Sequence, residues 1–198
     1  DADRVLMCDE NGSLIDGDDI MAIAAVDLLA QGSLAEKTLV STVMSNAGLD
    51  AAINAAGGKV IRTGVGDKLV IDEMLRGGFN FGGEQSGHLI FRDFSTTGDG
   101  LVAALQILRI MRASGKLLSQ LAKCWTRFPQ LLTNVVVREK KPFDQLNGVS
   151  ELVATAEAEL KTQGGRLSLR YSGTEPKARL LLEGRDRAVL DKWSQKIS

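Results

Sequence analysis

Residues 170–179 read Arg-Tyr-Ser-Gly-Thr-Glu-Pro-Lys-Ala-Arg, and this polar stretch lies between two β-rich runs, Arg166–Tyr171 and Ala178–Glu183. Glycine and proline between strand-forming residues predict two strands joined by a tight loop. Apolar residues at helical spacing precede and follow these strands, at Val149, Leu152, Val153, Ala156 and Leu160, and at Val189, Trp193 and Ile197. The last part of the chain is therefore predicted to fold as a small α+β unit.

The polar loop within residues 170–179 carries groups that suit an anion. Ser172 and Thr174 offer hydroxyl donors, and Gly173 lets backbone amides approach an anion closely. Arg170 and Arg179 each present a planar guanidinium that can contact two phosphate oxygens. The same residue types also make an ordinary polar turn with solvated arginines. The residues alone therefore leave a phosphate site and a simple turn both open.

Upstream of residue 126 the chain alternates between two periodicities. β-rich runs are predicted at Arg4–Cys8, Thr38–Val43, Val60–Thr63, Phe79–Phe81 and His88–Phe91, and helical stretches at Ile20–Leu29, Leu49–Ala56, Leu69–Leu75 and Leu101–Met111. In the last of these stretches one face is formed by Leu101, Leu105, Leu108 and Met111. Such alternation predicts a sheet with helices on its faces.

A break between two domains is predicted near residues 126–130. Proline disfavours helix in the residue before it, so a helix from Leu117 to about Thr126 should end ahead of Pro129. A β-branched strand, Leu131–Val137, follows the break. We therefore expect one domain on each side of it.

A second loop with chemical potential reads Gly-Gly-Glu-Gln-Ser-Gly-His at residues 82–88. Glu84, Ser86 and His88 alternate, so in an extended stretch their side chains would point the same way. A carboxylate beside a hydroxyl suits the vicinal hydroxyls of a sugar, and the single histidine of the chain could carry a proton near neutral pH. The alternative is a glycine-rich turn with a solvated glutamate and a structural histidine.

Composition excludes several classes of protein. The 198 residues carry 24 Lys and Arg against 25 Asp and Glu, so no basic excess favours nucleic acid as a partner. No apolar stretch approaches the ~18 residues of a membrane span, and the first residues do not have the pattern of a signal peptide. Cys8 and Cys124 are far apart in sequence and predict reduced thiols of a cytoplasmic protein. The chain begins at Asp1 without an initiator methionine, which is typical of processing or of a fragment.

The two loops together resemble those of the α-D-phosphohexomutase superfamily. Gly-Glu-x-Ser-Gly-His at 83–88 is similar to its sugar-binding loop, and Arg-x-Ser-Gly-Thr-Glu-Pro-x-x-Arg at 170–179 to its phosphate-binding loop. Three further segments resemble the phosphoglucosamine mutase branch: Met-Ser-Asn-Ala-Gly at 44–48, Val-Gly-Asp-Lys at 65–68 and Ser-Thr-Thr-Gly-Asp-Gly at 95–100. Lys68 stands where that branch usually has arginine. The resemblance covers the whole chain.

This resemblance implies a fold and a division into domains. Residues 16–125 are expected to form the family's third domain, a three-layer α/β/α structure that binds the sugar. Residues 130–198 are expected to form its fourth, a small α+β (TBP-like) domain that binds phosphate and closes over substrate about a hinge near Pro129. Residues 1–15 are expected to be the end of the second domain.

The resemblance also implies an activity for the whole protein. Such enzymes interconvert glucosamine 6-phosphate and glucosamine 1-phosphate through a phosphoserine, with glucosamine 1,6-bisphosphate as intermediate and activator. The phosphoserine loop of the family is not in this sequence, so the isolated chain is expected to bind sugar phosphate without turnover. Two alternatives stay open: a phosphomannomutase or phosphoglucomutase of the same superfamily, against which the Thr-Thr-Gly-Asp-Gly stretch argues, and a non-catalytic sugar-phosphate-binding module.

Residue roles carry over from the resemblance. Glu84 and Ser86 are expected to bind sugar hydroxyls, Arg4 to lie near the phosphoserine, and His88 to be a candidate proton carrier. The non-reacting phosphate is assigned to Arg170, Ser172, Gly173, Thr174 and Arg179. The partners implied are the small sugar phosphate and the missing N-terminal domains, with no nucleic acid and no membrane; a homodimer of the whole protein stays open.

The first residues resemble the end of the family's metal loop. That loop reads Asp-Gly-Asp-x-Asp-Arg and holds Mg²⁺ with three aspartates, and Asp1, Ala2, Asp3 and Arg4 match its last four positions. Asp1 and Asp3 are therefore candidate metal ligands. Two carboxylates at a chain end should bind a hard cation poorly, so Mg²⁺ is expected of the full-length enzyme.

Overall fold

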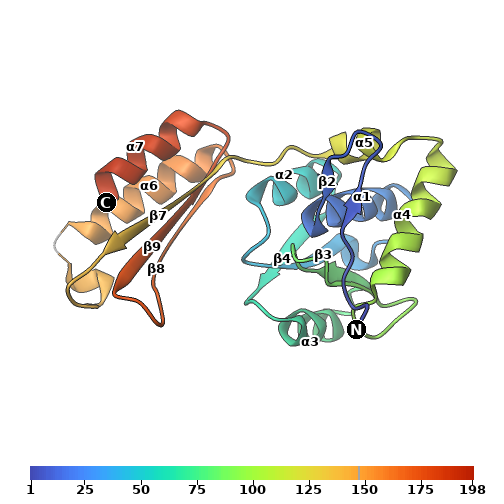
Figure 1. Ribbon diagram of the computed structural model, residues 1–198, viewed down its shortest axis with the longest axis horizontal. Helices are drawn as coiled ribbons and strands as arrows, with labels where there is room; N and C mark the ends of the chain where they lie inside the picture. Colours follow the sequence, from blue (N-terminus) through green and yellow to red (C-terminus); the bar gives the residue numbers. More distant parts are fainter. Residues whose placement is uncertain (147) are drawn as a thin grey trace. The chain divides into compact units, whose positions relative to one another are not determined.

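Four strands form the sheet of the larger part of the chain in the computed structural model, which describes residues 1–146 and 148–198. Their order is β4-β3-β5-β6 (Figure 1), with bounds Thr38–Thr42 for β3, Lys59–Thr63 for β4, Phe81–Gly83 for β5 and Leu89–Phe91 for β6. Strand β3 runs parallel to both β4 and β5, and β6 runs antiparallel to β5. The carboxyl ends of β3 and β5 therefore point toward the same edge of the sheet.

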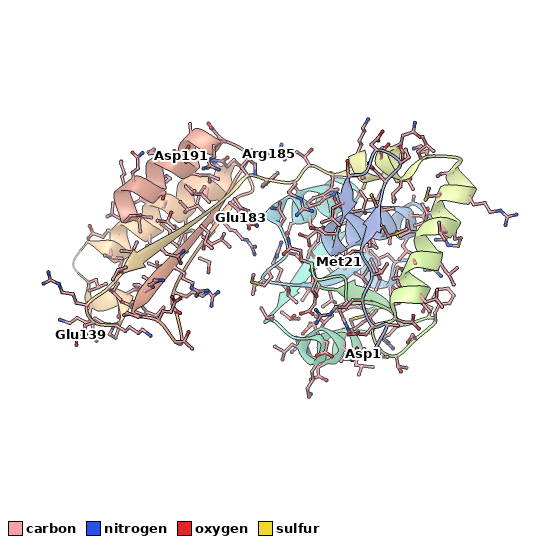
Figure 2. All side chains as sticks on the ribbon, in the orientation of Figure 1. Asp1, Met21, Glu139, Glu183, Arg185 and Asp191 are labelled. Carbon is pink, nitrogen blue, oxygen red and sulfur yellow. The ribbon has the colours of Figure 1, made fainter. Side chains whose placement is uncertain are left out.

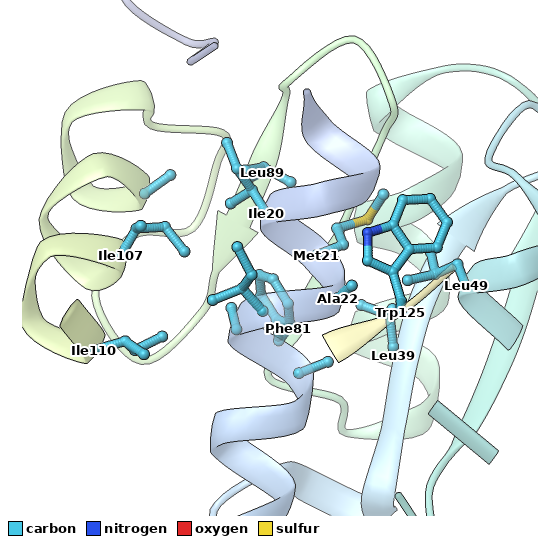
Figure 3. Packing of buried hydrophobic residues seen from close by; sticks show 14 of the residues in the cluster. Ile20, Met21, Ala22, Leu39, Leu49, Phe81, Leu89, Ile107, Ile110 and Trp125 are labelled. Carbon is cyan, nitrogen blue, oxygen red and sulfur yellow. The ribbon is translucent and has the colours of Figure 1, made fainter. Parts of the chain in front are cut away.

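Helices cover both faces of this sheet. The four long ones are α1 (Gly17–Ala30), α2 (Ala47–Ala55), α3 (Asp67–Gly77) and α4 (Gly100–Ser114). Neighbouring residues of one strand point to opposite faces: Leu39 packs in the cluster that contains α1, α2 and α4, whereas Val40 packs against α3. Figure 3 shows the first cluster, in which Ile20, Phe81 and Ile107 meet. The result is the expected three-layer α/β/α arrangement.

Local sequence explains where the helices begin. Asp16 caps α1, its carboxylate accepting from the amides of Asp18 and Asp19, and the Asp19 carboxylate accepts in return from the Asp16 amide. This reciprocal capping box satisfies amides that a helix start leaves without partners. Asp99 caps α4, its carboxylate accepting from the Val102 amide. Gly115 ends that helix in the left-handed conformation.

Of the four residues on the apolar face predicted for α4, Met111 packs partly against the core, but the other three do not. Leu101, Leu105 and Leu108 are exposed by 67%, 53% and 50%, while Ala103, Ile107 and Ile110 are buried. Both sets of residues recur at helical spacing, so periodicity predicted the helix correctly but could not decide which stripe faces the sheet.

Two other predicted elements also differ from the observed ones. The run Arg4–Cys8 forms only the short strand β1 (Met7–Cys8), paired with β2 (Leu14–Ile15), and an isolated bridge joins Arg4 to His88. The strand predicted at Phe79–Phe81 begins two residues before the observed strand β5. Phe79 packs against α3, and the strand begins at Phe81. A short 3₁₀ turn (Ala35–Lys37) precedes β3.

The helix predicted from Leu117 to Thr126 is wrong in extent. The structure has α5 (Leu118–Leu121) and a 3₁₀ turn (Ala122–Cys124), after which Trp125 is extended. Trp125 is buried and its indole Nε1 donates to Asp19 Oδ1 at 2.9 Å. Turning this large ring into the core ends the helix before Pro129 does.

The chain divides into two units, Asp1–Thr126 and Arg127–Ser198. In the second, β7 (Gln130–Val136), β9 (Lys177–Glu183) and β8 (Arg166–Tyr171) form an antiparallel sheet in that order, with a 3₁₀ turn at Phe143–Gln145. Helices α6 (Val149–Thr162) and α7 (Arg187–Ile197) pack on one face of it. This unit has its own core, made of Ala156, Leu160, Leu180, Leu182, Leu190 and Trp193.

Side chains sort between core and surface as the composition suggests. Met21 is buried in the first unit and Asp1 is exposed, while in the second unit Glu139 lies on the loop after β7 and Asp191 on α7 (Figure 2). Cys8 and Cys124 are free thiols. In the part of the chain that the structure describes, no helix has both the length and the apolar character needed to cross a bilayer.

Candidate functional site

Residues 84–87 form a tight turn between β5 and β6, so the extended stretch predicted for residues 84–88 is wrong. The Glu84 amide donates to the His88 carbonyl at 2.9 Å and the Gly87 amide to the Glu84 carbonyl at 3.0 Å. Gly87 has a φ of +88°, a conformation that glycine adopts without strain. The turn sends the side chains in different directions: His88 is buried, whereas Glu84 and Ser86 line a cavity.

Two other segments hold this turn by its backbone. The Gly17 amide at the start of α1 donates to the Gln85 carbonyl at 3.1 Å, and the Val5 amide donates to the Gly87 carbonyl at 3.0 Å. A β-carbon built on Gly17 would overlap the main-chain oxygen of Glu84. Glycine at residue 17 therefore lets the helix start and the turn touch directly.

The cavity beside the turn has a volume of about 480 Å³. Its lining residues come from five segments of the first unit: Arg4, Leu6, Leu14, Asp16, Thr42, Met44, Val65, Glu84, Gln85 and Ser86. Glu84 Oε1 accepts from the Gly66 amide at 3.0 Å, and Ser86 Oγ donates to Glu84 Oε2 at 3.5 Å. A fixed carboxylate beside a hydroxyl and a guanidinium can bind a ligand that carries both hydroxyl groups and negative charge.

His88 lies beneath the turn and does not line the cavity. Its Nδ1 is 3.3 Å from Asp3 Oδ2, and its Nε2 is buried without a hydrogen-bond partner among the residues that the structure describes. The ring packs so closely on Gly98 that a β-carbon there would overlap it. The pKa of Asp3 is lowered, first by the hydrogen bond from its own backbone amide and then by His88. The alternation in sequence predicts that the His88 side chain points the same way as those of Glu84 and Ser86, and this prediction is wrong.

The two candidate metal ligands do not form a complete metal site. Asp3 is engaged with His88 and lies 3.8 Å from Arg4 Nε, and Asp1 is exposed. Within residues 1–146 and 148–198 no three His, Cys, Asp or Glu side chains are grouped so that they could hold a metal ion. The donor set of this chain therefore does not fit Mg²⁺ by itself.

In the second unit, the loop between β8 and β9 is closed around Ser172. The Ser172 amide donates to the Lys177 carbonyl at 2.8 Å, and Ser172 Oγ accepts from the Glu175 amide at 3.3 Å. Lys140 Nζ donates to the Ser172 carbonyl at 2.6 Å, which brings a cation from a segment outside the loop to Ser172. Ser172 is buried, while Gly173 and Thr174 are exposed at the tip.

Arg170 and Arg179 lie directly opposite one another on β8 and β9. Like charges in that position destabilise a sheet unless an anion lies between or beside them. Glu175 partly fills that role: its Oε2 is 3.0 Å from Arg179 Nη2, and its pKa is lowered by the hydrogen bond from Lys177 first and from Arg179 second. Arg179 Nε is buried without an acceptor among the described residues.

The predicted site residues thus fall into two groups, each within one unit. Arg4, Glu84 and Ser86 line one cavity of the first unit. Arg170, Ser172, Gly173, Thr174 and Arg179 lie on one loop and its flanking strands in the second. Sequence reasoning missed Lys140 and Gly17, because neither belongs to a motif and each acts through a segment distant in sequence.

Two family models match the chain. The first, described as "Phosphoglucomutase/phosphomannomutase, alpha/beta/alpha domain III", matches residues 16–128. The second, described as "Phosphoglucomutase/phosphomannomutase, C-terminal domain", matches residues 132–198. Together the two models span both units and both candidate loops.

Curated relatives match along nearly the whole chain. A phosphoglucosamine mutase of Geobacter metallireducens is 54% identical over 198 residues, which are 100% of this chain and 44% of that protein. A phosphoglucosamine mutase of Anaeromyxobacter dehalogenans is 55% identical over 195 residues, which are 96% of this chain and 42% of that protein. The chain therefore spans less than half the length of the curated relatives it matches.

Solved structures share the fold. An Aspergillus fumigatus N-acetylphosphoglucosamine mutase, solved in complex with GlcNAc-6P and magnesium, aligns with a TM-score of 0.74 at 22% identity, covering 100% of this chain and 50% of that one. A phosphoglucomutase/phosphomannomutase family protein of Burkholderia thailandensis aligns with a TM-score of 0.70 at 20% identity, covering 98% and 43%. At these identities the likeness concerns the fold.

Proposed function

Because the chain belongs to the phosphoglucomutase/phosphomannomutase family, we propose that it is part of a phosphoglucosamine mutase, which interconverts glucosamine 6-phosphate and glucosamine 1-phosphate. In this proposal the chain supplies the sugar-binding turn of residues 84–87 and the phosphate-binding loop of residues 172–176. The names of the curated relatives, which match 100% and 96% of this chain, support this choice of substrate.

The observation that carries the proposal is the cavity of the first unit. It collects Arg4, Glu84 and Ser86 from segments more than 75 residues apart, and it holds the Glu84 carboxylate in place through the Gly66 amide. A solvated surface glutamate would have no such backbone contact. A carboxylate fixed beside a hydroxyl and a guanidinium suits sugar hydroxyls near a phosphate.

The proposed roles follow from this geometry. Glu84 and Ser86 bind sugar hydroxyls, while Arg170, Ser172, Gly173, Thr174 and Arg179 bind the phosphate that does not react. Binding energy from these remote contacts aligns the reacting end of the sugar. A phosphoserine outside residues 1–198 donates its phosphoryl group to the free hydroxyl, which gives the bisphosphate; the serine oxygen then accepts the other phosphoryl group.

Two residues have proposed roles closer to the reaction. Arg4 extends a largely exposed guanidinium at the cavity, where it can neutralise charge on the phosphoryl group in transfer. For His88 a role as proton carrier is only a hypothesis. Its side chain is buried and its Nδ1 faces Asp3 and not the cavity. Asp1 and Asp3 would contribute to a magnesium site only with further ligands, so no step here is assigned to a metal.

The isolated chain is proposed to bind sugar phosphate without turnover. It carries neither the phosphoserine loop nor three grouped carboxylates among its described residues. We propose residues 1–15 as the end of the second domain, 16–125 as the third and 130–198 as the fourth. A cytoplasmic location and the remaining domains as partners belong to the same proposal. Detectable mutase turnover by the purified chain would contradict it.

An amide-shift NMR titration with glucosamine 6-phosphate tests this function. Shifts are expected at residues 84–88 and 172–174, and they should weaken in Arg179→Ala but not in Arg187→Ala, an exposed arginine paired with Asp191 on α7. Stronger binding of mannose 6-phosphate or glucose 6-phosphate would favour a sister mutase. If millimolar ligand causes no shift in this chain, nor in a longer chain that includes the preceding domains, the two loops are structural and the proposal fails.

A further inference from the structure

The segment of residues 42–46 forms one wall of the cavity in the first unit. It leaves the carboxyl end of β3 and enters α2, and Thr42 and Met44 from it line the cavity. Its four last amides all have acceptors: Val43 donates to the Thr63 carbonyl, Met44 to Thr42 Oγ1, Ser45 to the Thr42 carbonyl and Asn46 to Asp18 Oδ2. Carbonyl groups of the same segment are held by a separate set of contacts.

Arg62 of β4 supplies these contacts. Its Nη1 donates to the carbonyls of Thr42 and Ser45, both at 2.8 Å, and its Nη2 donates to the Asn46 carbonyl at 3.1 Å. Nε donates to Asp50 Oδ1 at 3.2 Å, and Nη2 also pairs with Asp50 Oδ2. The side chain is only 17% exposed. One guanidinium thus joins three carbonyl groups of the wall to the first turn of α2.

We infer that Arg62 is a positioning residue, whose guanidinium holds residues 42–46 in the form that presents Thr42 and Met44 to the cavity. Arg62 does not line that cavity, so it acts through the wall and not on a ligand directly. A planar fork with five donors can reach three carbonyls and a carboxylate at once, which the single ammonium of lysine cannot do. The inference depends on the proposed function only for the identity of the ligand.

Two substitutions separate the carbonyl contacts from the ion pair. Arg62→Lys keeps the charge opposite Asp50 but loses the fork, whereas Asp50→Asn keeps the fork and removes the charge of its partner. Arg76→Lys is the matched control, because Arg76 is exposed on α3 and pairs only with Glu73 among the ion pairs described. If the ion pair alone mattered, Arg62→Lys would stay close to wild type and Asp50→Asn would cause the larger change.

The experiment measures amide hydrogen exchange of residues 43–46 in the full 198-residue chain, together with its affinity for glucosamine 6-phosphate. In Arg62→Lys, exchange at these amides is expected to rise about tenfold, while β5 and β6 stay within about twofold of wild type. Affinity should fall about tenfold, because the wall is no longer preorganised. Asp50→Asn should cause a smaller change in both, and Arg76→Lys none.

Unchanged exchange at residues 43–46 in Arg62→Lys would overturn the inference, as would a uniform rise across the first unit. If that variant does not fold, the wild-type chain decides: a held guanidinium gives separate, slowly exchanging Nη proton signals for Arg62, and a single averaged signal contradicts the inference. Failure of wild type to bind glucosamine 6-phosphate would sink the proposed function alone, since both of these measurements use the ligand-free chain.

Discussion

The Glu84 carboxylate is fixed at both oxygens, by the Gly66 amide at 3.0 Å and by Ser86 Oγ at 3.5 Å. A carboxylate held in this way offers its remaining lone pairs to a ligand at little cost in side-chain entropy. Its identity as a charged acceptor, and not only its shape, should therefore decide how well sugar hydroxyls are bound.

Glu84→Gln is expected to weaken binding of glucosamine 6-phosphate by about ten- to a hundredfold, the range of a hydrogen bond to a charged group. Binding of inorganic phosphate should not change, because the phosphate loop belongs to the other unit. Isothermal titration calorimetry of both ligands checks this, with Glu36→Gln on an exposed turn as control. Equal weakening of both ligands would show that the substitution disturbs the fold.

Glu175 should make the stability of the loop at residues 172–176 depend on pH in the acidic range. Its pKa is lowered by Lys177 first and by Arg179 second, so its carboxylate stays charged below the ordinary glutamate value of about 4.3. A lowered folded-state pKa stabilises the fold above the ordinary value, and this contribution is lost as the pH falls through the folded-state pKa.

The expected result is a carboxyl titration midpoint below the ordinary value in wild type, which moves back upward in Lys177→Met. Carbon-13 NMR of the Glu175 side chain measures it directly, and Lys161→Met on α6 is the control. A midpoint that Lys177→Met leaves unchanged would mean that the contact with Lys177 does not persist in solution.

At the scale of elements, two glycines with opposite surroundings allow a paired test. A β-carbon on Gly17 would overlap main-chain atoms of the turn at residues 84–87, whereas one on Gly173 meets no atom within 4 Å. Gly17→Ala is expected to lower the free energy of unfolding of the first unit by about 1–3 kcal/mol, because the helix start and the turn must separate. Denaturant unfolding followed by tryptophan fluorescence measures this loss.

Gly173→Ala should leave stability unchanged but weaken phosphate binding, because the added methyl group lies at the tip where amides would approach an anion. If Gly17→Ala is as stable as wild type, the backbone contact between Gly17 and the turn is looser than its 3.1 Å hydrogen bond indicates.

The sequence predicted which segments form helices and strands better than it predicted which face of each one is buried. The strand Arg166–Tyr171 has its predicted bounds, because polar and apolar residues alternate there between strong turn signals. In α4 two apolar stripes compete, and only packing against the sheet decides that Ile107 faces inward and Leu105 outward. The helix expected to reach Thr126 ends early because Trp125 finds a partner in Asp19, more than 100 residues away. Local patterns carry no information about such contacts.

The same limit applies to the candidate site. The motifs pointed to Glu84, Ser86 and the phosphate loop, and the family resemblance drawn from them is confirmed by the matching family models. They predicted neither the turn that separates His88 from Glu84 nor the contacts from Gly17 and Lys140. Those depend on where distant segments meet, which a single sequence does not encode locally.

At the scale of the whole molecule, the hydrophobic clusters of the first unit contain no residue of the second, and the reverse also holds. Leu180→Ala should therefore lower the free energy of unfolding of the second unit by about 2–5 kcal/mol, the range for truncating a buried leucine. Amide protection in β3 and β5 of the first unit should not change. Ile107→Ala is the reciprocal variant, and hydrogen exchange resolved by residue measures both. Loss of protection in both units from either substitution would show that the two cores unfold together.

The arginines that oppose each other across β8 and β9 have a practical consequence for anyone who handles this protein. A ligand that binds only the folded form raises the free energy of unfolding. Once the ligand concentration exceeds the dissociation constant, this increase grows with the logarithm of the concentration, and the melting temperature rises with it. If the loop binds phosphate as proposed, phosphate or sulfate in a storage buffer would occupy the arginine pair and conceal part of the repulsion between its members. Variants of this loop compared in such a buffer would look more alike than they are, and a chloride buffer of equal ionic strength would reveal their differences.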